Sequence, residues 1–134
     1  MATDHSDCCV VLGVRHPRLA EGLRDLLASV FDPVVVAPDE ETLFEATRTL
    51  RPQLAVVSLS LDAGDIVGLL KRLRSTAPEM KVIVLSMEEA PAVERAVVAA
   101  GADRLITMSD AAFELLPAAE ALIAAPHNPA PEEI

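Results

Sequence analysis

The sequence predicts an α/β protein in which a parallel sheet is covered by helices on both faces. Short apolar runs rich in β-branched residues recur along the 134 residues, and they predict five strands. Residues 54–59 (LAVVSL) contain no polar alternation, which is typical of a strand covered on both faces. Between the runs, apolar residues recur at helical spacing. Alternating strands and helices with short connections predict a doubly wound sheet.

The amino-terminal half predicts two strands and two helices. Residues 8–14 (CCVVLGV) and 33–37 (PVVVA) are the strands. Pro17 begins the first helix, since the first helical position tolerates a missing amide. Asp39 begins the second helix, and Pro52 stops its pattern. The residues expected to be buried on these helices are Leu19, Leu23, Leu26, Leu27 and Val30, then Leu43, Ala46, Thr47 and Leu50.

The carboxyl-terminal half continues the alternation. Strands are expected at 54–59, 81–86 (KVIVLS) and 104–108 (RLITM). Pro91 opens the fourth helix, and Gly101 closes it as a C-terminal cap. The residues expected to face inward on the third and fourth helices are Ile66, Leu69, Leu70 and Leu73, then Val93, Ala96, Val97 and Ala100.

The last helix is expected to start at Ser109 or Asp110 and to run to about Ala124. Pro117 lies inside it and predicts a kink or a late start. Right-handed crossovers then favour the flavodoxin-like strand order 2-1-3-4-5, with five helices. The expected organisation is a disordered segment 1–7, one domain 8–125 and a Pro-rich acidic tail 126–134.

Composition limits the classes of function. A net charge of −10 argues against a nucleic-acid surface, because binding phosphates requires clustered cations. The basic residues Lys71, Arg72 and Arg74 read as a solvated helix face. No apolar stretch is long enough to span a membrane, and the polar amino terminus is unlike a secretory signal, so we expect a cytoplasmic protein. Cys8 and Cys9 are interpreted as reduced thiols, because adjacent side chains on a strand point to opposite faces.

Four segments carry a resemblance to a known family. They are residues 16–27 (HPRLAEGLRDLL), 51–53 (RPQ), 81–87 (KVIVLSM) and 99–103 (AAGAD), and their order and spacing carry more weight than each alone. The chain resembles the receiver domain of bacterial two-component response regulators, from about Val10 to Ile123. It is most similar to receivers that are joined to a helix-turn-helix output domain. The resemblance implies phosphorelay signal transduction.

The residues that would perform the receiver chemistry are changed. In the family, an aspartate at the end of the third strand accepts a phosphoryl group from a histidine kinase, and the matching residue here is Ser58. Two acidic residues that hold Mg²⁺ correspond to Val14 and Arg15. A lysine that contacts the phosphoryl group corresponds to Met108. The hydroxyl at the end of the fourth strand is retained as Ser86.

These substitutions predict a receiver that cannot be phosphorylated in the usual way. A serine hydroxyl needs a neighbouring base to become a nucleophile, whereas a carboxylate is already ionised at neutral pH. Mg²⁺ prefers hard oxygen ligands, so we expect its binding to be lost. We therefore expect a pseudo-receiver that is not an enzyme, has no cofactor and works by protein–protein binding.

Three local hypotheses concern residues at this end of the sheet. Arg15 is expected to face Glu88 and Glu89, and a salt bridge there could fill the site; a plain exposed arginine is the alternative. His16 is read as a residue at the start of a helix in preference to a catalytic base. Ser58 is read as a small polar filler in preference to a phosphorylated serine.

A partner surface is expected on the fourth helix, fifth strand and fifth helix, the face through which receivers usually dimerise or bind partners. The apolar residues expected there are Val93, Val97, Leu105 and Met108, which could equally belong to the core. Leu105 stands where many receivers have a switching aromatic residue. The expected partner is a signalling protein or a second copy of the chain, without direct nucleic-acid or membrane contact.

Two alternatives remain open from the sequence. One is a phosphotransfer protein with an unconventional acceptor, such as Asp62, or Ser58 acting with Ser86; Asp65 lies in the same loop. The other is a flavodoxin-like module that binds a small ligand at the strand ends. The chain has no Gly-rich phosphate loop and few aromatic residues for stacking, which disfavours the second alternative.

Overall fold

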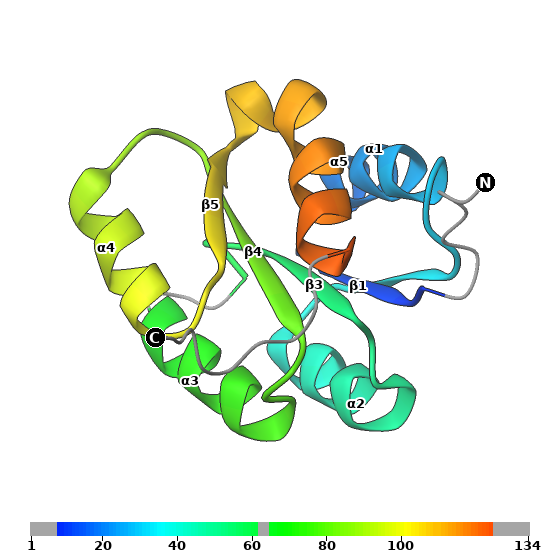
Figure 1. The fold of residues 1–134 in the computed structure, drawn as a ribbon, viewed down its shortest axis with the longest axis horizontal. Coiled ribbons are helices and arrows are strands. Elements are labelled where there is room, and N and C mark those ends of the chain that lie inside the picture. Colours follow the sequence, from blue (N-terminus) through cyan, green and yellow to red (C-terminus); the bar gives the residue numbers. More distant parts are fainter. Residues whose placement is uncertain (1–7, 62–64, 125–134) are drawn as a thin grey trace.

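The computed structural model describes residues 8–61 and 65–124. They form a parallel sheet with the order β2-β1-β3-β4-β5, so the predicted topology is confirmed (Figure 1). The strands are β1 (Val10–Gly13), β2 (Val34–Ala37), β3 (Leu54–Ser58), β4 (Lys81–Ser86) and β5 (Arg104–Thr107). The helices are α1 (Pro17–Ala28), α2 (Glu40–Leu50), α3 (Ile66–Thr76), α4 (Pro91–Ala99) and α5 (Met108–Ala124).

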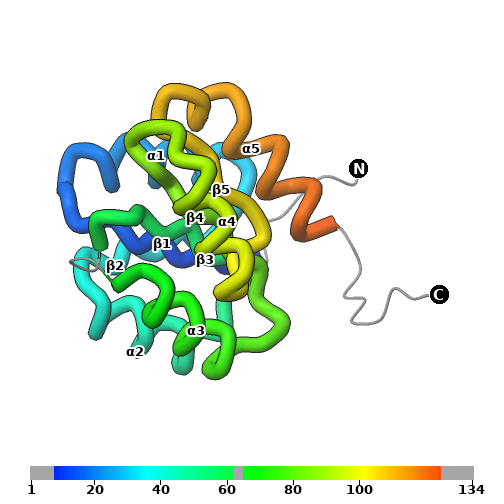
Figure 2. Tube along the Cα trace, turned by 90° about the vertical axis from the view of Figure 1, so that its left-hand side faces the viewer, coloured from blue at the N-terminus to red at the C-terminus, as the bar shows by residue number. Residues whose placement is uncertain are grey.

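Two apolar layers hold the helices against the sheet. Alternate residues of a strand point to opposite faces, so Val10 and Leu12 pack under α1 and α5, whereas Val11 packs under the other helices. Figure 2 shows α1 and α5 on one side of the sheet and α2 and α3 on the other. Val97 of α4 belongs to the same core cluster as α2 and α3. Because both faces are covered, the strands need the continuous apolar runs seen in the sequence.

Side chains at the helix starts explain where the helices begin. The Asp39 carboxylate accepts the Thr42 backbone N–H at 2.8 Å, which confirms the predicted start of α2. Asp65 accepts the Gly68 backbone N–H at 3.1 Å and caps α3 in the same way. At the other end of α4, Gly101 has a φ of 125°, which suits its predicted role in ending that helix.

Several predicted boundaries and burials are wrong. Cys8 and Cys9 precede β1, and Met108 belongs to α5 and not to β5. The α5 helix continues through Pro117, so the late start did not occur. Ala96 and Leu50 were expected inside but are exposed, because α4 buries only Val97 within its length and α2 turns Leu50 outward at its last position. Helical spacing alone does not fix how wide the buried stripe is.

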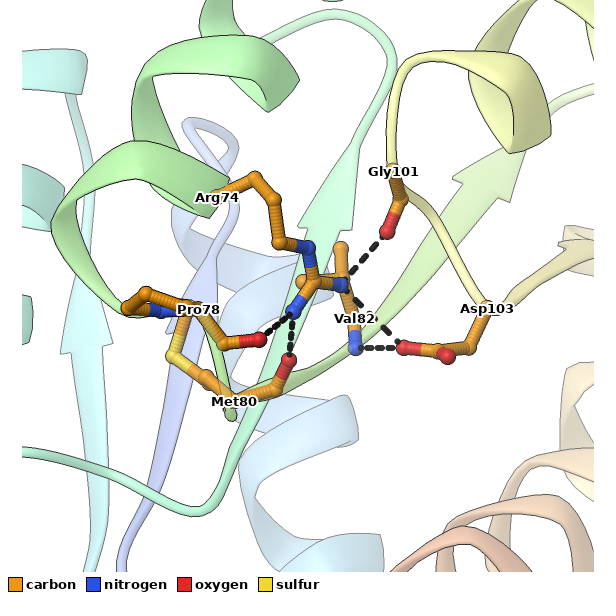
Figure 3. Close-up of polar contacts among 6 residues, drawn as sticks. All are labelled: Arg74, Pro78, Met80, Val82, Gly101 and Asp103. Atoms are coloured by element: carbon orange, nitrogen blue, oxygen red, sulfur yellow. Dashed lines mark hydrogen bonds and ion pairs between the residues drawn. The ribbon is translucent and has the colours of Figure 1, made fainter. Parts of the chain in front are cut away.

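Arg74 is not part of a solvated face, contrary to the prediction (Figure 3). Its guanidinium donates to the backbone carbonyls of Pro78 at 2.8 Å, Met80 at 2.5 Å and Gly101 at 2.5 Å. It also lies 3.4 Å from a carboxylate oxygen of Asp103. The side chain thereby ties the end of α3 to the loop before β4 and to the turn before β5.

Some expectations concern residues outside the described part of the chain. Asp62, the disordered segment 1–7 and the tail 126–134 lie there, so those predictions stand as predictions. Within residues 8–61 and 65–124, no helix is both long and apolar enough to cross a membrane.

Candidate functional site

Three buried hydroxyl groups line the carboxyl-terminal edge of the sheet. They belong to Ser58, Ser86 and Thr107, the last residues of the adjacent strands β3, β4 and β5. In the strand register Ser86 lies opposite Thr107, and Ser58 lies opposite Leu85. In the described part of the chain, the only other buried polar residue is Thr47. Ligands bind at this edge in open α/β sheets, so it is the candidate site.

Ser58 is bonded to its own loop. Its hydroxyl oxygen lies 2.9 Å from the hydroxyl oxygen of Ser60 and accepts the Ser60 backbone N–H at 3.2 Å. Only 7% of Ser58 is exposed, whereas Ser60 is exposed. The hydrogen-bond partner of the Ser58 side chain is thus another hydroxyl, which is not a base that could activate it.

Ser86 and Thr107 are satisfied locally as well. The Ser86 hydroxyl donates to the backbone carbonyl of Glu88 at 2.6 Å. The Thr107 hydroxyl donates to the Asp110 carboxylate at 3.1 Å and lies 3.2 Å from the Ser109 hydroxyl. Sequence reasoning did not single out Thr107; its position one residue before Met108, at the end of an apolar run, was the available signal.

Arg15 follows β1 and reaches across the loop that follows β3. Its guanidinium donates to the Leu61 backbone carbonyl at 2.6 Å. The predicted salt bridge from Arg15 to Glu88 or Glu89 is wrong, because the ion pairs of the described residues include neither glutamate. A fully buried Leu61 fixes the carbonyl that Arg15 binds, whereas both glutamates are exposed.

His16 lies at the N-terminal end of α1. Its ring Nδ1 accepts the Leu19 backbone N–H at 3.4 Å and caps the helix, as predicted for a residue at a helix start. Val14 is buried, and its backbone N–H donates to the Ala37 carbonyl at 3.2 Å. Neither residue presents an oxygen atom of a side chain to the site.

Comparison with known proteins adds a regulatory relative. No protein-family model matches the chain. The methanol utilization control regulatory protein MoxX of Paracoccus denitrificans is 31% identical over 103 residues, which are 75% of this chain and 46% of that protein. The chain thus spans a little less than half the length of this curated relative.

Solved structures agree closely in fold. The receiver domain of the putative response regulator NarL from Mycobacterium tuberculosis has a TM-score of 0.81 at 20% identity, over 91% of this chain and 99% of that one. A response regulator from Thermotoga maritima has a TM-score of 0.79 at 23% identity, over 88% and 98% of the two chains. A LuxR-family two-component response regulator from Aurantimonas sp. SI85-9A1 has a TM-score of 0.80 at 24% identity, over 87% and 84%.

The chain has the response regulator receiver fold. In a receiver the carboxyl-terminal edge holds Mg²⁺, so the residues of this edge can be tested for their fit to that ion. The buried Val14 offers no ligand, and the Arg15 guanidinium would repel a cation. Within residues 8–61 and 65–124, no three acidic, histidine or cysteine residues are grouped to hold a metal. The described residues therefore do not fit Mg²⁺.

The apolar residues predicted as a receiver partner surface are mostly core. Val97 is fully buried, Val93 and Leu105 pack against the cluster under α2, α3 and α4, and Met108 packs against the cluster under α1 and α5. For Val97 the alternative that the sequence left open, a place in the core, is the one that the structure shows. The large apolar side chains that are exposed in the described residues are Leu50, Met87, Val98 and Phe113.

Between α4 and α5, four acidic residues gather beside the apolar side chains of Leu105 and Ile106. A hollow of about 280 Å³ there is lined by the acidic residues Glu89, Glu94, Asp110 and Glu114. Arg104 forms an ion pair with Glu114 at 3.3 Å. A partner that docked over this hollow would meet mainly negative charge.

Proposed function

We propose that the chain is a receiver-fold signalling module that is not phosphorylated at the usual position and acts by binding a protein partner. The observation that carries the proposal is the state of Ser58, a buried hydroxyl bonded to Ser60 where a receiver has its acceptor aspartate. Phosphoryl transfer to it would need a base, and its hydrogen-bond partner is a second hydroxyl.

The surroundings of Ser58 support the same conclusion. A phosphoryl group gathers negative charge during transfer, which receivers neutralise with Mg²⁺ and a lysine. At the matching positions this chain has Val14, Arg15 and Met108. Arg15 is the one cation among them, and it is bonded to the Leu61 carbonyl. Met108 packs against the core and cannot neutralise charge.

A signalling role also agrees with the regulatory relative MoxX, with which the chain shares 31% identity over 103 residues. A receiver without phosphorylation chemistry can still bind a partner through its surface. The role that we propose for this chain is therefore binding and not catalysis. Its resting conformation would be set by packing alone, because no phosphoryl group would shift it.

Phosphorylation can be tested directly. The chain is incubated with Mg²⁺ and acetyl phosphate, and its intact mass is measured beside a conventional receiver treated in the same way. We expect the added mass of a phosphoryl group on the conventional receiver and none on this chain. Phosphorylation of most molecules would refute the proposal, and fragmentation would then show whether Asp62 or Ser58 is the acceptor.

Partner binding is tested by charge reversal over the acidic hollow. A pull-down from the native cell compares the natural chain with a Glu89→Lys/Glu94→Lys variant, and size-exclusion chromatography with light scattering reports whether the chain binds itself. We expect the variant to lose the partner or the dimer, because both residues line the hollow and form no ion pair within the described residues. If the variant keeps both the partner and the dimer, the binding surface lies outside this hollow.

A further inference from the structure

A cavity lies at the opposite end of the sheet from the candidate site. Its volume is about 560 Å³, within the range of ligand pockets. It is formed where α2 and α3 end and where β3 and β4 begin, with Ile123 of α5 at its border. Neither the receiver positions nor the proposed partner surface extends to it. The lining residues are Thr47, Arg48, Arg51, Pro52, Gln53, Thr76, Ala77, Pro78, Glu79, Met80, Lys81 and Ile123.

Three cations of this pocket have no partner in the described part of the chain. The side chains of Arg48, Arg51 and Lys81 take part in none of its four ion pairs and in none of its side-chain hydrogen bonds. Glu79 is the one carboxylate among the lining residues. This local excess of positive charge stands out in a chain with a net charge of −10. This excess of positive charge favours an anionic ligand in the pocket.

The lining has two kinds of surface. On the polar part, the Arg48 and Arg51 guanidinium groups offer forked donors that match phosphate oxygens, and Lys81 adds a point charge. On the apolar part, Pro52, Pro78 and Met80 are joined by Ala77 and Ile123. A ligand with one anionic end and one less polar end would contact both.

We propose that this pocket binds a small organic phosphate, with its phosphoryl group held by Arg48, Arg51 and Lys81. The two negative charges of a phosphate monoester balance the three cations more completely than the single charge of a carboxylate does. The organic part of the ligand would lie against Pro78 and Met80. The inference is independent of the proposed function, since it uses none of the residues at the carboxyl-terminal edge.

Arg48 and Arg51 also have a second explanation that the test must separate. Cations near the end of a helix stabilise its negative dipole end, and both residues lie at the end of α2. A purely structural role predicts that removing them lowers stability and leaves ligand binding unaffected. Thermal unfolding of each variant is therefore measured beside binding.

The experiment titrates the ¹⁵N-labelled chain with AMP and with glucose 6-phosphate, using adenosine and glucose as uncharged controls. Two variants remove the same charge at different places. Arg48→Gln/Arg51→Gln removes two of the three positive charges from the pocket. Arg18→Gln/Arg95→Gln, the matched variant, removes two exposed arginines that have no ion pair within the described residues. A peptide of six glutamates tests for an acidic polypeptide as the ligand.

We expect at least one of the two phosphates to shift the backbone amide signals of Gln53, Thr76 and Ala77 in a saturable way. The pocket variant should weaken this binding about tenfold or more, and the matched variant should leave it within about twofold. No saturable shift with either phosphate, equal binding by both variants, or shifts with the glutamate peptide alone would each overturn the proposal.

Discussion

The Asp103 carboxylate accepts the backbone N–H of Val82 at 2.8 Å, through the same oxygen that lies 3.4 Å from the Arg74 guanidinium. Val82 is in β4, and Asp103 is in the turn that leads into β5. Asp103 also donates its own backbone N–H to the Val82 carbonyl at 2.8 Å. These two residues therefore extend the β4–β5 pairing by one residue ahead of Arg104, the first residue of β5, and Arg74 lies beside the carboxylate that takes part (Figure 3).

Replacing Arg74 by methionine should lower the free energy of unfolding by about 1–3 kcal/mol, because three backbone carbonyls lose a charged donor. Lys71→Met is the matched control on the same helix, since Lys71 is exposed and has no ion pair within the described residues. Urea unfolding monitored by circular dichroism measures both. Equal stability of the two variants would show that the Arg74 contacts add nothing.

Ser58→Asp should destabilise the fold by about 2 kcal/mol or more at neutral pH, because a buried carboxylate there has no metal and no lysine beside it. Burial should raise the pKa of the new carboxyl group. The penalty should therefore shrink as the pH falls and the group becomes neutral. Ser60→Asp, at an exposed position, is the control and should have little effect. A stable Ser58→Asp variant at pH 7 would contradict our description of the site.

The thiol of Cys8 should react slowly in the folded chain. Burial, with a smaller contribution from Cys9, raises the pKa of Cys8 from 9.0 to about 11. Burial also raises the pKa of Cys9. Thiolate is the reactive form, so near pH 8 alkylation of Cys8 by iodoacetamide should be about 100-fold slower than in urea, or slower still because access is restricted.

The same shift has a consequence for stability. A thiol pKa that is higher in the folded than in the unfolded chain stabilises the fold below about pH 9, and this contribution is lost as the pH rises toward 11. A Cys8→Ala variant should therefore show a shallower loss of stability than the natural chain across that range. An identical pH dependence in both would contradict the raised pKa.

Asp39 should contribute to stability in a pH-dependent way. The hydrogen bond from the Thr42 backbone N–H lowers the pKa of this carboxyl group, and Arg15 adds a smaller effect in the same direction. A lowered pKa stabilises the fold above the unfolded pKa, and the contribution is lost as the pH falls through the folded pKa.

Asp39→Ala should accordingly lower the melting temperature more at neutral pH than at about pH 2. Asp39→Asn retains an acceptor oxygen without the charge, so its effect should change less with pH than the effect of Asp39→Ala. Differential scanning calorimetry of both variants checks this. The same loss from Asp39→Ala at both pH values would refute the role of the charge.

The sequence by itself determined the fold of this protein. A strand that is apolar along its whole length is stable only where helices cover both faces of the sheet. Because a helical segment lies between each pair of consecutive strands, the strands form a parallel sheet. Local signals also fixed helix ends, because Asp39 and Gly101 act on the backbone beside them. The resemblance to receivers pointed to Ser58 and Ser86, which the structure places at the carboxyl-terminal ends of β3 and β4.

Only the tertiary structure decided which side chains meet. The Arg15 guanidinium binds the Leu61 carbonyl and neither of the two glutamates expected there. The Arg74 guanidinium binds carbonyl groups of two loops. Both contacts depend on the course of loops, and Leu61 and Gly101 are distant in sequence from the arginines that bind them. The buried side of α4 is narrower than its helical spacing predicted: Val97 is buried as expected, whereas Ala96 is exposed. The basic pocket at the far end of the sheet arises from two segments distant in sequence, 47–53 and 76–81, together with Ile123, so no local pattern could predict it.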